Sequence, residues 1–197
     1  NTITGTAKAD TINPGLGADS VYAGDGVDTI VITEATSSLD KIYLNPGATG
    51  DAVEAATEYA ATEAVTITGF TSADRLVIDE SKLAHIDFST NVTAGTEKAL
   101  VSGNYTEIVG TGTFVTEKVN IVKTNAYANI GALITAATAG TGIDAIIGFE
   151  NTTSGNFELY DTDTAQTSST WTLLASFTDI TAATAAATFS EANFILI

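Results

Sequence analysis

Residues 1–31, NTITGTAKADTINPGLGADSVYAGDGVDTIV, carry a nine-residue period that decides the fold of the first part of the chain. Residues 5–31 divide into three consecutive nonapeptides, GTAKADTIN, PGLGADSVY and AGDGVDTIV. An aspartate occupies the sixth position of each nonapeptide and an aliphatic residue the eighth: Asp10, Asp19 and Asp28, then Ile12, Val21 and Ile30. Asn1 stands at the aspartate position of a preceding repeat. A fixed short period indicates stacked repeats, each packed on its neighbours.

The spacing predicts a turn of six residues followed by a strand of three. Glycines in the turns adopt tight or left-handed backbone angles at little steric cost, and four fall at turn positions: Gly15, Gly17, Gly24 and Gly26. Two nonapeptides make one coil, so repeats two apart stack on the same edge. The aliphatic residues then point inward as a small core. This arrangement is a parallel β-roll.

The aspartates face away from that core and indicate a calcium site. Ca²⁺ prefers six to eight oxygen ligands, which carboxylates and turn carbonyls supply. We expect Asp10 and Asp28 to share one ion on one edge. Asp19 lies on the other edge, between Asn1 and Ser37 in this register. The predicted metal ligands and turn positions are Asp10, Asp19, Asp28, Gly15, Gly17, Gly24, Gly26 and Asn1. The alternative is ordinary glycine-rich turns with solvated aspartates; the first repeat has Thr6 and Lys8 at glycine positions.

Composition excludes several function classes. The 197 residues include 24 acidic and 7 basic side chains, for a net charge of −17, so nucleic acid and anionic membranes are poor partners. No cysteine is present, which excludes disulfides and thiolate metal sites. No apolar run approaches the ~20 residues of a membrane span, and no signal peptide is visible. His85 is the only histidine, and no nucleophile–base motif accompanies it, so we expect no catalytic residues and no enzyme.

The rest of the chain predicts short strands and little helix. Strands are expected at 29–33, 40–44, 65–70, 75–79, 107–109, 118–122, 145–150, 156–161 and 170–177. Residues 51–64 are a helix or an insert, and 126–137 fit a helix capped by Asn125. Residues 139–147 copy the nonapeptide once, at Asp144, and are interpreted as a turn before a strand. The predicted fold class is mainly β: a short calcium-binding parallel β-roll (residues 1–48), then a β-rich sandwich-like or roll-like part (49–142 and 143–197) with one or two short helices.

The nonapeptides resemble those of the RTX proteins, which Gram-negative bacteria export by type I secretion. Val65–Leu83 (VTITGFTSADRLVIDESKL) resembles the segment that follows RTX arrays, and residues 143–197 resemble the C-terminal part of large RTX surface proteins. The resemblance implies a calcium-dependent, secreted protein with an uncleaved export signal at its C-terminus. Because residue 1 falls inside a repeat and is not Met, we expect this chain to be the C-terminal piece of a longer protein.

Two function classes follow from the resemblance. The first is the structural and assembly region of a surface-layer (S-layer) protein or adhesin at the cell surface, with self-association, the type I machinery and cell-surface polysaccharide as partners. The alternative is the folding and secretion region of an exoenzyme whose active part lies upstream. An array would use acidic turns bridged by Ca²⁺ between molecules. The candidate turns are those at Asp40, Asp74, Asp79-Glu80 and Asp161-Thr162-Asp163.

Overall fold

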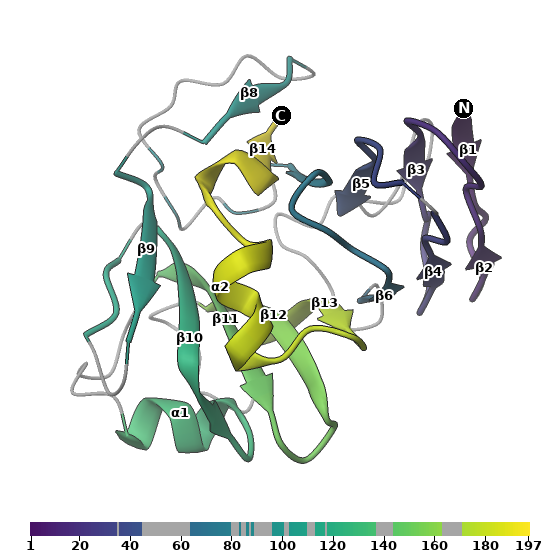
Figure 1. Ribbon diagram of the computed structural model, residues 1–197. Helices are drawn as coiled ribbons and strands as arrows, with labels where there is room; N and C mark the ends of the chain where they lie inside the picture. Colours follow the sequence, from purple (N-terminus) through teal and green to yellow (C-terminus); the bar gives the residue numbers. More distant parts are fainter. Residues whose placement is uncertain are drawn as a thin grey trace.

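The nine-residue period appears as regularly spaced short strands in the computed structural model (Figure 1). The structure describes residues 1–34, 36–44, 64–79, 83, 86, 88, 96–100, 103–109, 113–116, 118–136, 144–162 and 171–197. Within these residues the chain is mainly β, with two mixed sheets and two α-helices. The predicted segments 45–63 and 137–143, and His85, lie outside the described residues.

The two sheets divide the strands of the first part between them. The first sheet has the order β1 (Thr2–Thr4), β3 (Ser20–Tyr22), β5 (Lys41–Leu44), β7 (Arg75–Ile78), β14 (Phe194–Leu196) and β8 (Lys98–Ala99). The second has the order β2 (Thr11–Ile12), β4 (Thr29–Val31), β6 (Val65–Thr68), β13 (Thr172–Phe177), β12 (Asn156–Thr162), β11 (Ala145–Asn151), β10 (Val119–Tyr127) and β9 (Tyr105–Ile108).

From β1 to β7 the chain alternates between the sheets, and like strands pair in parallel. Thr2 pairs with Ser20 and Thr11 with Thr29, so repeats two apart do stack, as the sequence predicts. The next coil is longer, because Ser20 pairs with Lys41. We call residues 1–44 and 64–78 the winding. Its inward residues are wholly buried between the sheets: Val21, Ile30, Ile42, Ile67 and Leu76.

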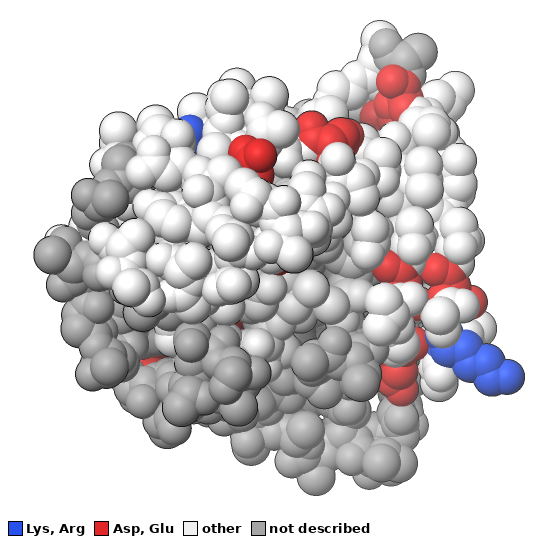
Figure 2. All heavy atoms as spheres, turned by 90° about the horizontal axis from the view of Figure 1, so that it is seen from below, with Lys and Arg blue, Asp and Glu red and all other residues white. Residues whose placement is uncertain are grey.

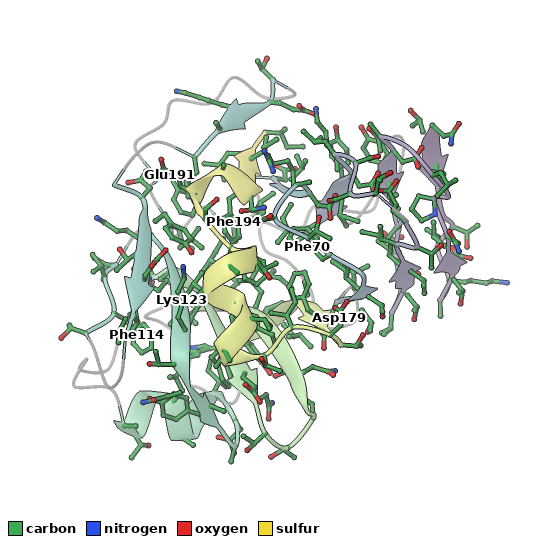
Figure 3. All side chains as sticks on the ribbon, in the orientation of Figure 1. Phe70, Phe114, Lys123, Asp179, Glu191 and Phe194 are labelled. Carbon is green, nitrogen blue, oxygen red and sulfur yellow. The ribbon has the colours of Figure 1, made fainter. Side chains whose placement is uncertain are left out.

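The C-terminal strands join the winding. β13 pairs in parallel with β6, and β14 pairs in parallel with β7. Each sheet therefore continues from the first part of the chain into the last. A cluster of phenylalanines centred on Phe189 fills the junction, with ring centroids 5.2 Å from Phe177 and 5.7 Å from Phe70. Figure 3 shows Phe70 and Phe194 at this junction.

Helix α2 (Ala182–Thr188) crosses between β13 and the C-terminal strand and packs on β10. Thr181 caps its N-terminus, and Lys123 of β10 lies against its far end (Figure 3). The ammonium group of Lys123 is buried, donates to the carbonyl of Ala186 at 3.2 Å and pairs with Glu107. These contacts satisfy a buried charge that would otherwise be costly.

The helix predicted over 126–137 is wrong in its first half. β10 continues to Tyr127, where Ala126 and Tyr127 pair with β11, and helix α1 spans only Ile130–Ala136. Asn129, rather than Asn125, accepts a hydrogen bond from the backbone of Ala132, at 2.9 Å. Sheet pairing outweighs the helical periodicity here. Neither described helix is long enough to be a candidate for crossing a membrane.

Candidate metal centre

The first column of carboxylates lies in the turns that follow β1 and β3. The backbone N–H of Asp10 donates to Asp28 Oδ1 at 2.8 Å, and that of Thr29 donates to the carbonyl of Asp10 at 2.9 Å. The sequence prediction that Asp10 and Asp28 are adjacent is therefore confirmed. Thr6 donates to Asp10 Oδ2 from both its backbone and its hydroxyl group, at 2.6 and 2.8 Å. Thr6, at a glycine position of the repeat, thus caps the end of this column.

The glycines form the close turns that hold the column together. The φ angles of Gly15, Gly17, Gly24 and Gly26 are all positive, between 91° and 108°, as predicted. At Gly24 a Cβ atom would lie 2.2 Å from the carbonyl oxygen of Thr6, so the turn at 23–27 stacks directly on the turn at 5–9. A Cβ at Gly15 would meet nothing within 4 Å.

The second column lies in the turns on the other edge and has more members than the sequence predicts. The backbone N–H of Asp19 donates to Asp40 Oδ1 at 2.8 Å, and that of Asp40 donates to Asp74 Oδ1 at 3.0 Å. The amino group of Asn1 pairs with Asp19 Oδ1, as expected for the upstream neighbour. We define the second column as Asp19, Asp40 and Asp74.

The predicted downstream neighbour of Asp19, Ser37, is wrong. Its hydroxyl group pairs instead with that of Thr71, at 2.7 Å. The reason is a longer loop: Asp40 follows Asp19 by 21 residues rather than 18, so the third coil resumes the register at Asp40. Sequence reasoning missed this residue as a column member, although Asp40-Lys41-Ile42 and Asp74-Arg75-Leu76 repeat the aspartate-x-aliphatic pattern of the nonapeptides.

Several carboxylate oxygens in the two columns are buried without a partner among the described residues. These atoms are Oδ2 of Asp19, Asp28 and Asp40, and Oδ1 of Asp25. The first three side chains are at most 2% exposed. A buried anionic oxygen without a partner is unfavourable by several kcal/mol unless a proton or a cation neutralises it, as a general order of magnitude. Each column is therefore missing a positively charged partner.

The pKa values of the buried carboxyls reflect this deficit. Burial raises the pKa of Asp28, and the nearby carboxylates of Asp10 and Asp25 raise it further. Burial likewise raises the pKa of Asp40 to about 6, with contributions from Asp74, Glu34 and Asp19. The backbone hydrogen bonds to both groups act in the opposite direction but are outweighed. The sites thus disfavour negative charge that nothing compensates.

The acidic groups gather on one side of the molecule. Figure 2 shows Asp and Glu atoms concentrated toward the side where Figure 1 places β1–β5, with one basic side chain beside them. Asp40, Asp74 and Asp161 are nevertheless buried, at 0, 1 and 5% exposure. The prediction that their turns bridge neighbouring molecules is therefore wrong for these three residues.

The donor set fits a hard cation that also takes backbone oxygens. No group of three or more His, Cys, Asp or Glu side chains in the described ranges is arranged to hold a metal alone. Each column offers pairs of carboxylates beside turns rich in carbonyl groups. Ca²⁺, with a flexible shell of six to eight oxygens, fits such a mixed set better than Zn²⁺, which selects nitrogen and sulfur. Asp144, by contrast, precedes β11 and stands in neither column.

Comparisons with known proteins add no relative: no protein-family model, no curated protein and no solved structure matches this chain.

Proposed function

We propose that this chain is a calcium-dependent structural and assembly region of a secreted bacterial surface-layer protein, with the winding as a calcium-binding β-roll. The single observation that carries the calcium part is Asp28. Its carboxylate is 0% exposed, its Oδ1 accepts from Asp10, and its Oδ2 has no hydrogen-bond partner in the described residues. An ion between Asp10 and Asp28 supplies the missing positive charge.

Calcium binding of this kind makes folding depend on location. Extracellular modules bind Ca²⁺ with Kd of about 10⁻⁴–10⁻³ M. At ten times Kd, one site adds about 1.4 kcal/mol to the free energy of unfolding, against a typical total of ~5–15 kcal/mol. Where free Ca²⁺ is scarce, the repulsion among buried carboxylates favours the unfolded chain. Where it is plentiful, the winding folds. This supports export through a type I secretion machinery before folding.

Thermal unfolding with and without chelator tests the calcium part. We expect EGTA to lower the Tm and the strand signal in circular dichroism, and Ca²⁺ in excess to restore both. Asp28→Asn keeps the shape and Oδ1 of the side chain and removes its charge, so its melt should respond less to Ca²⁺. Asp144→Asn is the matched control and should behave as the wild type. Identical wild-type melts in EGTA and in millimolar Ca²⁺ would reject the proposal.

Assembly is a separate part of the proposal and needs the full-length protein. The net charge of −17 opposes self-association, and divalent cations between carboxylates reverse that repulsion. We expect light scattering and electron microscopy to show sheets or ordered oligomers as Ca²⁺ rises to millimolar, and not with Mg²⁺. A full-length protein that stays monomeric at every Ca²⁺ concentration would remove the surface-layer assignment and favour an exoenzyme.

A further inference from the structure

The second column continues past the last nonapeptide, into turns that contain neither the nine-residue spacing nor its glycines. Asp40 follows the sequence EATSSL, and Asp74 follows TSA. The carboxylates are nevertheless stacked as tightly as in the repeats, with rung-to-rung hydrogen bonds of 2.8 and 3.0 Å. One oxygen of Asp40 and one of Asp74 are thereby fixed by the preceding rung.

The free oxygens of this column concentrate between Asp19 and Asp40. Asp74 Oδ2, at the end of the column, accepts from the backbone and the hydroxyl group of Thr71 at 2.7 and 2.9 Å. Asp19 Oδ2 and Asp40 Oδ2 are buried, and no hydrogen-bond donor among the described residues reaches them. Both side chains are at least 98% buried. The unsatisfied atoms thus come from two adjacent rungs and not from the capped end.

A further carboxylate adds to the charge at this point. Glu34 spans the two turns, accepting from Gly17 N at 2.7 Å and from Ser38 N at 2.6 Å. It lies close enough to Asp40 to disfavour ionisation of that residue, as do Asp74 and Asp19. Of the ion pairs in the described part of the chain, the one that reaches the column joins Asn1 to Asp19. Arg75 instead donates to the carbonyls of Ala73 and Asp74, both at 2.8 Å.

We infer that Asp19 and Asp40 hold a second Ca²⁺, outside the nonapeptide repeats, with Glu34 supplying further negative charge beside it. The donors are all oxygens, which excludes the softer metals that select imidazole or thiolate. Ca²⁺ is favoured over Mg²⁺ because a loop of irregular length imposes no octahedral geometry. The inference extends the calcium dependence proposed above but rests on different residues from the pair Asp10 and Asp28.

This second ion would act where the winding lacks its usual support. The loop between β4 and β5 replaces the glycine turn with a longer segment, and Glu34 ties that segment to the turn at 14–18 through Gly17. An ion shared by Asp19 and Asp40 joins the second coil to the third. The same column passes to Asp74, whose turn contacts the C-terminal segment through Asn193. Calcium bound here would therefore stabilise the junction with the C-terminal strands as well as the repeats.

Isothermal titration calorimetry on the whole chain, stripped with EGTA and dialysed, tests the inference with CaCl2 as the titrant and Mg²⁺ as a control. We expect the wild type to bind at least two equivalents of Ca²⁺. Asp40→Asn should lose one equivalent and retain the others, Asp28→Asn should lose a different one, and Asp144→Asn should bind as the wild type. The double variant Asp28→Asn with Asp40→Asn should lose two equivalents.

The outcomes separate the two claims. Unchanged stoichiometry and affinity in Asp40→Asn overturn the second site, whatever Asp28→Asn does. A loss in Asp40→Asn with none in Asp28→Asn supports the second site and rejects the first. Should Asp40→Asn fail to fold by circular dichroism in millimolar Ca²⁺, Asp19→Asn carries the same expectation. A wild-type chain that binds only one equivalent, lost on Asp28→Asn, also overturns the inference.

Discussion

Asn193 Nδ2 donates to the backbone oxygen of Asp74 at 2.8 Å, and this contact joins the C-terminal segment to the end of the second carboxylate column. Asn193 ends a short 3₁₀ helix, η3 (Glu191–Asn193), and is 0% exposed. Its other amide hydrogen bond reaches the carbonyl of Ser72 at 3.1 Å, and its Oδ1 accepts from Ser190. The amide thus fixes the turn that presents Asp74 to the column.

We predict that Asn193→Ala lowers the free energy of unfolding by about 2–3 kcal/mol, because it removes buried hydrogen bonds and leaves polar groups without partners. Urea denaturation in millimolar Ca²⁺ measures the change. Glu191→Ala, on the exposed side of the same helix, is the control and should cost less than about 0.5 kcal/mol. Equal midpoints for Asn193→Ala and Glu191→Ala would show that the contact is dispensable.

Glycines with similar φ angles should differ in their tolerance of a side chain. Gly24 and Gly15 have φ of 91° and 93°, so each substitution with alanine carries a backbone cost of about 1–2 kcal/mol. Only at Gly24 does the new Cβ also collide with a neighbouring turn, at Thr6. Gly24→Ala should therefore be at least about 2 kcal/mol more destabilising than Gly15→Ala in denaturant titrations, an overpacking penalty of ordinary size. Similar losses for both variants would contradict the stacked turns.

The calcium-free protein should lose stability as pH rises from about 4 to 7. The pKa of Asp40 is about 6 in the folded chain and near its model value of 3.8 when unfolded. The folded state therefore binds more protons in this window, and linkage makes that stabilisation disappear as pH passes 6. Asp40→Asn cannot titrate, so its stability relative to wild type should increase with pH when both are measured in EGTA. A difference that stays constant between pH 4 and 7 would contradict the prediction.

Much of the winding could be predicted because its period is local. Asp10, Ile12 and Val21 identify the turn, the strand and the inward face, and a nine-residue spacing leaves one register for stacking. The prediction failed where the period breaks: three extra residues before Asp40 shift the next rung, so Ser37 loses its place to Asp40. The aspartate-x-aliphatic pattern at Asp40 is a signal for the rung, but without equal spacing it does not stand out.

The remaining differences come from contacts distant in sequence. A helical pattern runs through Tyr127, but residues up to that point pair with β11 and form a strand. Likewise, nothing near Phe194 indicates that it pairs with Leu76, more than a hundred residues earlier. Glu34 was missed because its role depends on two backbone N–H groups, Gly17 and Ser38, that only the folded loop brings together.

A crystal structure of the chain grown in millimolar Ca²⁺, with an anomalous difference map, tests the central claim most directly. The account predicts an ion between the turns of Asp10 and Asp28, with Asp28 Oδ2 and turn carbonyls among its ligands at about 2.3–2.6 Å. A second ion is expected at Asp19 and Asp40. A map that shows both aspartate columns well ordered and no ion at Asp28 would contradict the account.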